Sequence, residues 1–115
     1  MKKYQYILND IYTTFSKECK FSPGTLEERG VRIELSPQAS IILREIKESI
    51  YVFGKDEQGK VISLMSLKPG QTIPFFHFMP MFKKAYPEET KVLRKIYWRI
   101  IALMKPPSIQ FIKSL

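Results

Sequence analysis

The feature that most constrains the fold is a segment near residues 88–104, in which apolar and basic side chains separate onto two faces of a helix. At 100° per residue, its lysines and arginines fall within an arc of about 140°. A helix with one wholly apolar face must bury that face against another layer of the protein. The apolar face consists of Val92, Leu93, Ile96, Tyr97, Ile100, Ile101, Leu103 and Met104.

Signals at both ends support this helix. Pro87 suits the first helical turn, and Glu88 and Glu89 place negative charge at the positive end of the helix dipole. The helix is expected to stop at Lys105, because two prolines follow it directly.

A second amphipathic helix is predicted at residues 3–19. Its apolar positions fall within one arc of about 140°, although two threonines at 13 and 14 lower its intrinsic propensity. The sequence FSPG at 21–24 then predicts a turn. The apolar positions are Tyr4, Ile7, Leu8, Ile11, Tyr12, Phe15 and Cys19.

Several segments show the alternation of strands. Residues 31–35 alternate apolar and charged side chains, and the runs 50–54 and 61–67 flank a polar loop with Gly59, which predicts a hairpin. The sequence TIPFF predicts a further strand that Pro74 confines to an edge, and residues 109–113 predict a final one.

Residues 38–48 fit two interpretations. Ser36 and Pro37 form a good helix start, so we expect a short helix there. Ile41 and Leu43 also alternate with polar neighbours, so a strand is the alternative. A further short helix, interrupted by Pro80, is predicted between residues 77 and 86.

Together these elements predict an α+β fold in a single small domain spanning residues 1–115. The N-terminal and C-terminal helices are expected to pack on a small, mostly antiparallel sheet, because parallel pairing needs long crossovers. If residues 38–47 are a strand, a small RNA-binding type of barrel becomes the alternative.

Charge and hydropathy narrow the class of partner. The chain has a net charge of +8, and residues 81–115 hold eight lysines and arginines against two glutamates. Such a local excess predicts a polyanionic partner.

No apolar stretch reaches the ~18 residues of a transmembrane helix, and the N-terminus lacks the continuous apolar core of a signal peptide. With one cysteine, Cys19, the sequence predicts a cytoplasmic protein.

His77 is the single histidine, and no acid occurs between Glu57 and Glu88. A metal site needs further ligands, so neither a metal nor a cofactor is expected. Common catalytic motifs are absent from the sequence. One catalytic alternative remains, a metal-independent ribonuclease that uses His77 with Lys83, Lys84 and the basic helix.

Trp98, the single tryptophan, falls in the middle of the basic arc rather than on the apolar face. Cations that follow phosphates, beside a ring that stacks a base, are typical of single-stranded nucleic-acid binding. We therefore expect a non-catalytic protein that binds RNA or single-stranded DNA in preference to duplex, as a small regulator or accessory factor. The alternative is a protein-interaction module, an inhibitor or complex subunit, with Trp98 as its anchor. The candidate binding residues are Lys83, Lys84, Lys91, Arg94, Lys95, Trp98, Arg99 and Lys105.

Overall fold

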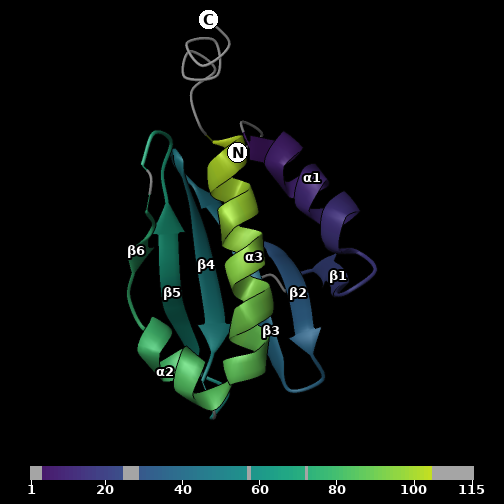
Figure 1. Cartoon of the computed structure of the whole chain (residues 1–115), viewed down its shortest axis with the longest axis vertical. Coiled ribbons are helices and arrows are strands. Elements are labelled where there is room, and N and C mark those ends of the chain that lie inside the picture. The colour runs from purple at the N-terminus through teal and green to yellow at the C-terminus, as the bar shows by residue number, and fades with distance from the viewer. Residues whose placement is uncertain (1–3, 25–28, 57, 72, 105–115) are drawn as a thin grey trace, which may run out of the picture.

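The computed structural model describes residues 4–24, 29–56, 58–71 and 73–104. Within these ranges six strands form one antiparallel sheet in the order of the chain, β1 to β6 (Figure 1). Three helices accompany it, and α3 runs across one face of the sheet with α1 beside it. The elements are α1 (Gln5–Phe15), β1 (Lys20–Pro23), β2 (Val31–Ser36), β3 (Ala39–Ile46), β4 (Ser49–Lys55), β5 (Val61–Leu67), β6 (Phe75–Phe76), α2 (Met79–Ala85) and α3 (Pro87–Leu103).

The predicted α+β fold is confirmed. Helix α3 begins and ends close to where its sequence signals place it, whereas α1 ends at Phe15, before the predicted residue 19. The predicted hairpin is β4 paired with β5. The barrel alternative is not found, since β1 and β6 lie at opposite edges of an open sheet among the described strands. The predicted strand at 109–113 lies outside the described residues.

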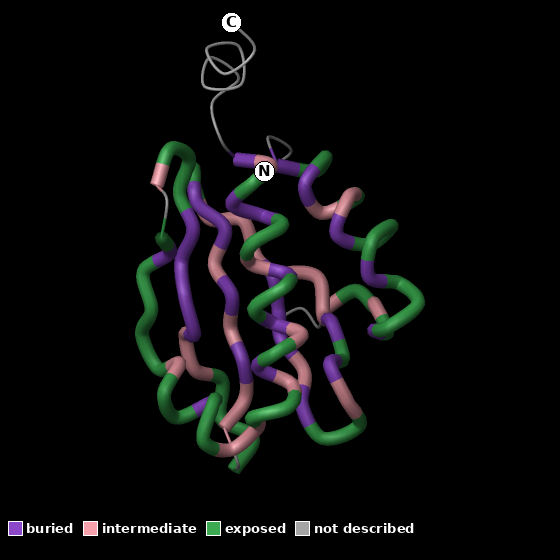
Figure 2. Tube along the Cα trace, in the orientation of Figure 1, coloured by how far each residue is buried: buried purple, intermediate pink, exposed green. Residues whose placement is uncertain are grey.

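The core lies between the sheet and the two longer helices. Every second residue of the central strands faces this layer, which is the arrangement that strand alternation dictates. Figure 2 shows buried positions recurring along the strands and along α3. The core includes Ile7 and Ile11 of α1, Ile33, Ile41, Leu43, Val52 and Met65 of the sheet, and Leu93, Ile96 and Ile100 of α3.

The helix predicted at 38–48 is wrong, because these residues form the central strand β3. Ser36 and Pro37 start a tight turn instead of a helix: the Gln38 backbone N–H donates to Ser36 Oγ at 3.2 Å, and Ala39 pairs back with Ser36. The next turn places Lys47 at a φ of 55°. Because a lysine rarely adopts that conformation, the sequence carries no ordinary signal for this turn.

Three smaller differences concern element boundaries. The predicted turn at 21–24 falls largely within β1, an edge strand, which tolerates its terminal proline. β6 is only two residues long and follows Pro74 directly. Pro80 lies in the first turn of α2 and so starts that helix rather than interrupting it.

Candidate functional site

The basic face of α3 points away from the sheet. Leu93, Ile96 and Ile100 are fully buried beneath the helix, whereas Trp98 on the opposite side is 52% exposed. Seven of the eight candidate binding residues are described, and all seven are exposed, while Lys105 lies outside the described residues. The seven are Lys83, Lys84, Lys91, Arg94, Lys95, Trp98 and Arg99.

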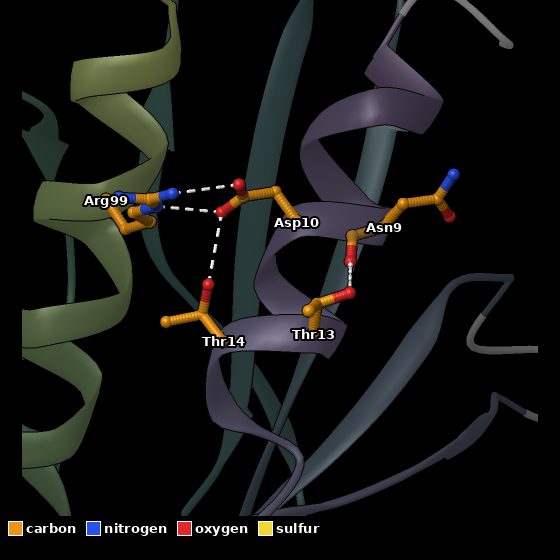
Figure 3. Close-up of polar contacts among 5 residues, drawn as sticks. All are labelled: Asn9, Asp10, Thr13, Thr14 and Arg99. Carbon is orange, nitrogen blue, oxygen red and sulfur yellow. Dashed lines mark hydrogen bonds and ion pairs between the residues drawn. The ribbon is translucent and has the colours of Figure 1, made fainter.

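Arg99 is engaged with α1. Its Nε donates to one carboxylate oxygen of Asp10 at 2.7 Å, and a second guanidinium nitrogen donates to the other oxygen at 2.9 Å (Figure 3). The Thr14 hydroxyl also donates to this carboxylate at 3.4 Å. The hydrogen bonds and charge of Arg99 hold the pKa of Asp10 below its ordinary value. Arg99 therefore joins α3 to α1.

Lys91 is also paired, but weakly. Its ammonium lies 2.8 Å from the Glu88 carboxylate one turn earlier, and both side chains are more than two-thirds exposed. Ion pairs at such positions contribute little and exchange readily with solvent or another anion.

A groove runs between α3 and the β6–α2 side of the sheet. It encloses about 500 Å³. We call it the α3–β6 groove, and its walls combine aromatic and aliphatic side chains with two cations. The lining residues are Phe76, Met79, Pro80, Lys83, Thr90, Arg94 and Tyr97.

Two aromatic contacts connect the rings that line the groove to Trp98. Phe76 meets the edge of Tyr97 with ring centroids 5.7 Å apart, and Tyr97 stacks on Trp98 at 5.2 Å with an interplanar angle of 29°. Phe76, Tyr97 and Trp98 thus form a continuous aromatic row from the sheet edge to the exposed side of α3. Two of its members are only about half covered, Phe76 at 45% and Trp98 at 52% exposed.

The strand register places Phe76 in this groove. Phe76 pairs with Met65, whose side chain belongs to the core, so both side chains lie on the helix-bearing face of the sheet. Tyr97 lies at the margin of the apolar face of α3 and is half-buried, which brings it within reach of Phe76.

Phe82 anchors the other wall. This side chain is 2% exposed, and it packs where Gly54 leaves room, since a Cβ at that glycine would lie 3.2 Å from the Phe82 ring and 2.8 Å from Leu64. The Thr90 hydroxyl donates to the Tyr86 carbonyl at 2.8 Å, which ties the start of α3 to the end of α2. The position of α2, and with it of Lys83 in the groove, therefore depends on the Phe82 anchor.

The neighbouring lysines 83 and 84 point to different surroundings. Lys83 lines the α3–β6 groove, whereas Lys84 lines a smaller cavity of about 270 Å³ that also contains Asp56. Lys83, Arg94 and Lys95 form no ion pair with any other described residue. The structure therefore brings two of the candidate cations, Lys83 and Arg94, to the groove and directs Lys84 elsewhere.

His77 lies exposed on the turn between β6 and α2, where its backbone N–H donates to the Leu64 carbonyl at 3.0 Å. It does not line the α3–β6 groove. The described ranges contain no group of three or more His, Cys, Asp or Glu side chains placed to hold a metal ion. No helix in the described part of the chain is long and apolar enough to span a bilayer.

Phe76 and Tyr97 were not among the residues that the sequence predicted for the site. Phe76 belongs to the TIPFF segment, which predicted only an edge strand, and Tyr97 was assigned to the apolar face of its helix. The useful signal was that Tyr97, near the margin of the apolar face, directly precedes Trp98 in the sequence. Comparison with known proteins adds no relative: no family model matches the chain, and neither the curated proteins nor the solved structures include a match.

Proposed function

We propose that this protein binds single-stranded nucleic acid, RNA or single-stranded DNA, along the α3–β6 groove, without catalysis. The observation that carries this proposal is a groove in which Lys83 and Arg94 lie with two rings of the aromatic row, which continues from the groove to the exposed Trp98. Cations that neutralise phosphates and rings that stack bases are the two components of such sites. A single strand fits this arrangement because its bases are free to turn toward the rings.

Each side chain has a distinct proposed role. Trp98, the most exposed ring of the row, stacks a base, and Tyr97 supports it from behind. Lys83 and Arg94 contact phosphates at the groove, and Lys95 and Lys91 extend the positive track along α3. Arg99 is left out of this set because its guanidinium is held by Asp10. A protein of this kind acts as a small regulator or accessory factor.

The lone tryptophan supplies the first test. Trp98 fluorescence is followed while the protein is titrated with single-stranded RNA, single-stranded DNA and duplex DNA at several salt concentrations. We expect quenching by the single strands and an affinity that falls steeply as salt rises. Absence of quenching by all three at low salt would contradict the proposal.

A protein partner is the second candidate function. Between residues 73 and 81 an unusual number of large apolar side chains are at least 45% exposed, and exposed apolar clusters mark interaction surfaces. These are Ile73, Phe75, Phe76, Phe78 and Met81.

A photocross-linking amino acid placed at position 78, with one at Tyr12 as the control, tests this alternative in cells. Tyr12 is similarly exposed, at 56%, but lies on α1. One defined protein adduct formed only from position 78 would favour the protein partner. Nucleic-acid adducts, or equal labelling from both positions, would argue against it.

A further inference from the structure

The two residues of β6 point to opposite faces of the sheet. Phe76 pairs with Met65 and faces α3, whereas Phe75 pairs with Ser66 and faces the side away from the helices, which we call the outer face. Both rings are exposed, Phe75 at 58% and Phe76 at 45%. The aromatic row of the groove therefore meets a second aromatic surface at this edge, separated from it only by one short strand.

The outer face continues from Phe75 across the sheet. The strand pairings place Arg44, Tyr51, Ser66 and Phe75 in one cross-strand row, on strands β3 to β6. Tyr51 also stacks along its own strand on Phe53, with centroids 6.1 Å apart and an interplanar angle of 14°. Aromatic rings thus follow one another from the edge to the middle of this face.

This face differs from an ordinary solvated one. Ile42 lies on it and is only 2% exposed, yet it is not part of the core shared with the helices. Its cross-strand neighbours are Arg32 and Phe53, both half-buried. A sheet face that meets only water usually carries polar side chains, so the aromatic rings beside a covered isoleucine indicate a surface made for contact.

The charge of this region selects an anionic partner. Lys68 Nζ lies 5.8 Å from the centre of the Phe75 ring, and Arg44 stands beside Tyr51. No acid occurs between Glu57 and Glu88, the stretch that includes β5, β6 and α2, and Glu48, which lines a pocket with Tyr51 and Lys68, is accompanied there by Lys47. A second copy of a chain with a net charge of +8 is poorly suited to this surface.

We infer that a strand bound in the α3–β6 groove turns around the β6 edge and continues onto the outer face, where Phe75 and Tyr51 stack bases and Lys68 and Arg44 contact phosphates. This inference rests on the proposed function. A flexible single strand can contact both faces of a sheet edge, whereas a planar bilayer meets one side of a protein at a time. Among anionic partners, the geometry therefore favours a nucleic-acid strand over a lipid surface.

The test compares two single-stranded RNA lengths, about 4 and about 16 nucleotides, which bracket the sites of comparable proteins. Affinities are measured by Trp98 fluorescence for the wild type and for Phe75→Ala, Arg44→Ala and the control Tyr12→Ala. Phe75 and Tyr12 are similarly exposed, at 58% and 56%, so removing either ring should leave the fold intact. Circular dichroism verifies the fold of each variant.

We expect Phe75→Ala to weaken binding of the longer RNA about 10-fold and to leave the shorter one unchanged, since the loss of one stacked base has about this effect. Arg44→Ala should reduce the salt dependence for the longer RNA alone. Tyr12→Ala should bind both lengths as the wild type does.

Other outcomes overturn the inference. If the wild type binds RNA and Phe75→Ala loses nothing, or loses equally on both lengths, the outer face is not part of the path although the groove remains a site. If the wild type binds neither length, the proposed function fails and the inference fails with it. Binding to phosphatidylserine vesicles that Phe75→Ala abolishes, without any length dependence on RNA, would assign this edge to a membrane surface.

Discussion

The two flanks of α3 use the same helix in opposite ways. On the α1 flank, the charge of Arg99 is matched by Asp10, and the Tyr6 hydroxyl donates to the Leu103 carbonyl at 3.4 Å. On the β6 flank, Lys83 and Arg94 face a groove, without an ion pair to any residue in the described ranges, and the ring of Phe76 remains half exposed. On the α1 flank, the polar groups of α3 are paired within the protein. On the β6 flank, cations and rings stay accessible, as in a binding surface.

The basic residues of one helical face can therefore have different roles, in a contact within the protein or at an open groove. Arg94 and Arg99 are five residues apart on the same exposed side of α3, and sequence alone treats them alike. Their surroundings separate them, because α1 supplies a carboxylate to one and the β6 side supplies aromatic rings to the other. The following predictions test whether the two flanks are independent.

The largest expected effect comes from removing one buried anchor on each flank. Phe82→Ala on the β6 flank should lower the free energy of unfolding by about 3–5 kcal/mol, and Ile11→Ala on the α1 flank by about 2–5 kcal/mol. Both side chains are almost fully buried. Only Phe82→Ala should also weaken RNA binding, because Lys83 loses its fixed position. Urea denaturation and RNA titration of the folded variants measure both effects, and equal loss of binding in the two would show that the flanks are coupled.

Trp98→Ala should separate binding from stability. The ring is half exposed, so the free energy of unfolding should change little, whereas the binding free energy should weaken by about 1–3 kcal/mol. The slope of log affinity against log salt should stay the same, because no phosphate contact is removed. Fluorescence anisotropy of a labelled RNA replaces the lost tryptophan signal. An affinity equal to that of the wild type would remove Trp98 from the site.

Arg94→Ala and Arg99→Ala form a matched pair on one helix. Arg94→Ala should reduce the magnitude of the salt slope by about 0.7, the value for one phosphate contact of a single strand, with little effect on melting temperature. Arg99→Ala should leave the slope unchanged and lower the melting temperature slightly, since it frees Asp10 from its partner. The reverse result would assign the binding surface to the α1 flank. Lys17→Ala, an exposed cation on neither flank, is the control.

The smallest expected effect is on the acid sensitivity of the fold. Because the pKa of Asp10 is lowered in the folded state, its ion pair stabilises the protein fully above the unfolded-state value. This stabilisation is lost as the pH falls below about 4 through the lowered pKa. Asp10→Asn should therefore melt slightly earlier at pH 7 and converge with the wild type once the pH has fallen through the lowered pKa of Asp10. Melting curves across that pH range measure this convergence, and a constant difference would contradict the role of the pair.

Much of the fold follows from periodicity, and the exceptions have local causes. The helices α1 and α3 and the β4–β5 hairpin were predictable because their apolar spacing is regular, and α3 also carries ordinary signals at its start. β3 was not, because Ser36 and Pro37 resemble a helix start and Lys47 occupies a turn position that glycine or asparagine normally fills. The prediction of a helix gave these local signals more weight than the strand alternation of Ile41 and Leu43, which the fold follows.

The candidate site was predictable only in part. Trp98 and the exposed cations were identifiable because a helical wheel separates faces, and α3 keeps those faces in the fold. The wheel carries no information about neighbours, so it did not distinguish Arg94 from Arg99. Phe76 entered the site through the pairing of β6 with β5, a contact that depends on tertiary register and that the TIPFF sequence alone does not specify.

The sequential order of the sheet also has a consequence for how the chain is made. Each strand pairs with the one before it, so the sheet can assemble by successive hairpins while synthesis proceeds. The helix that covers its apolar face, α3, is the last of the described elements to leave the ribosome. At about 5–20 residues per second, the nascent sheet exposes that face for a second or more before α3 arrives. This interval is when the protein is most prone to aggregate and most in need of a chaperone.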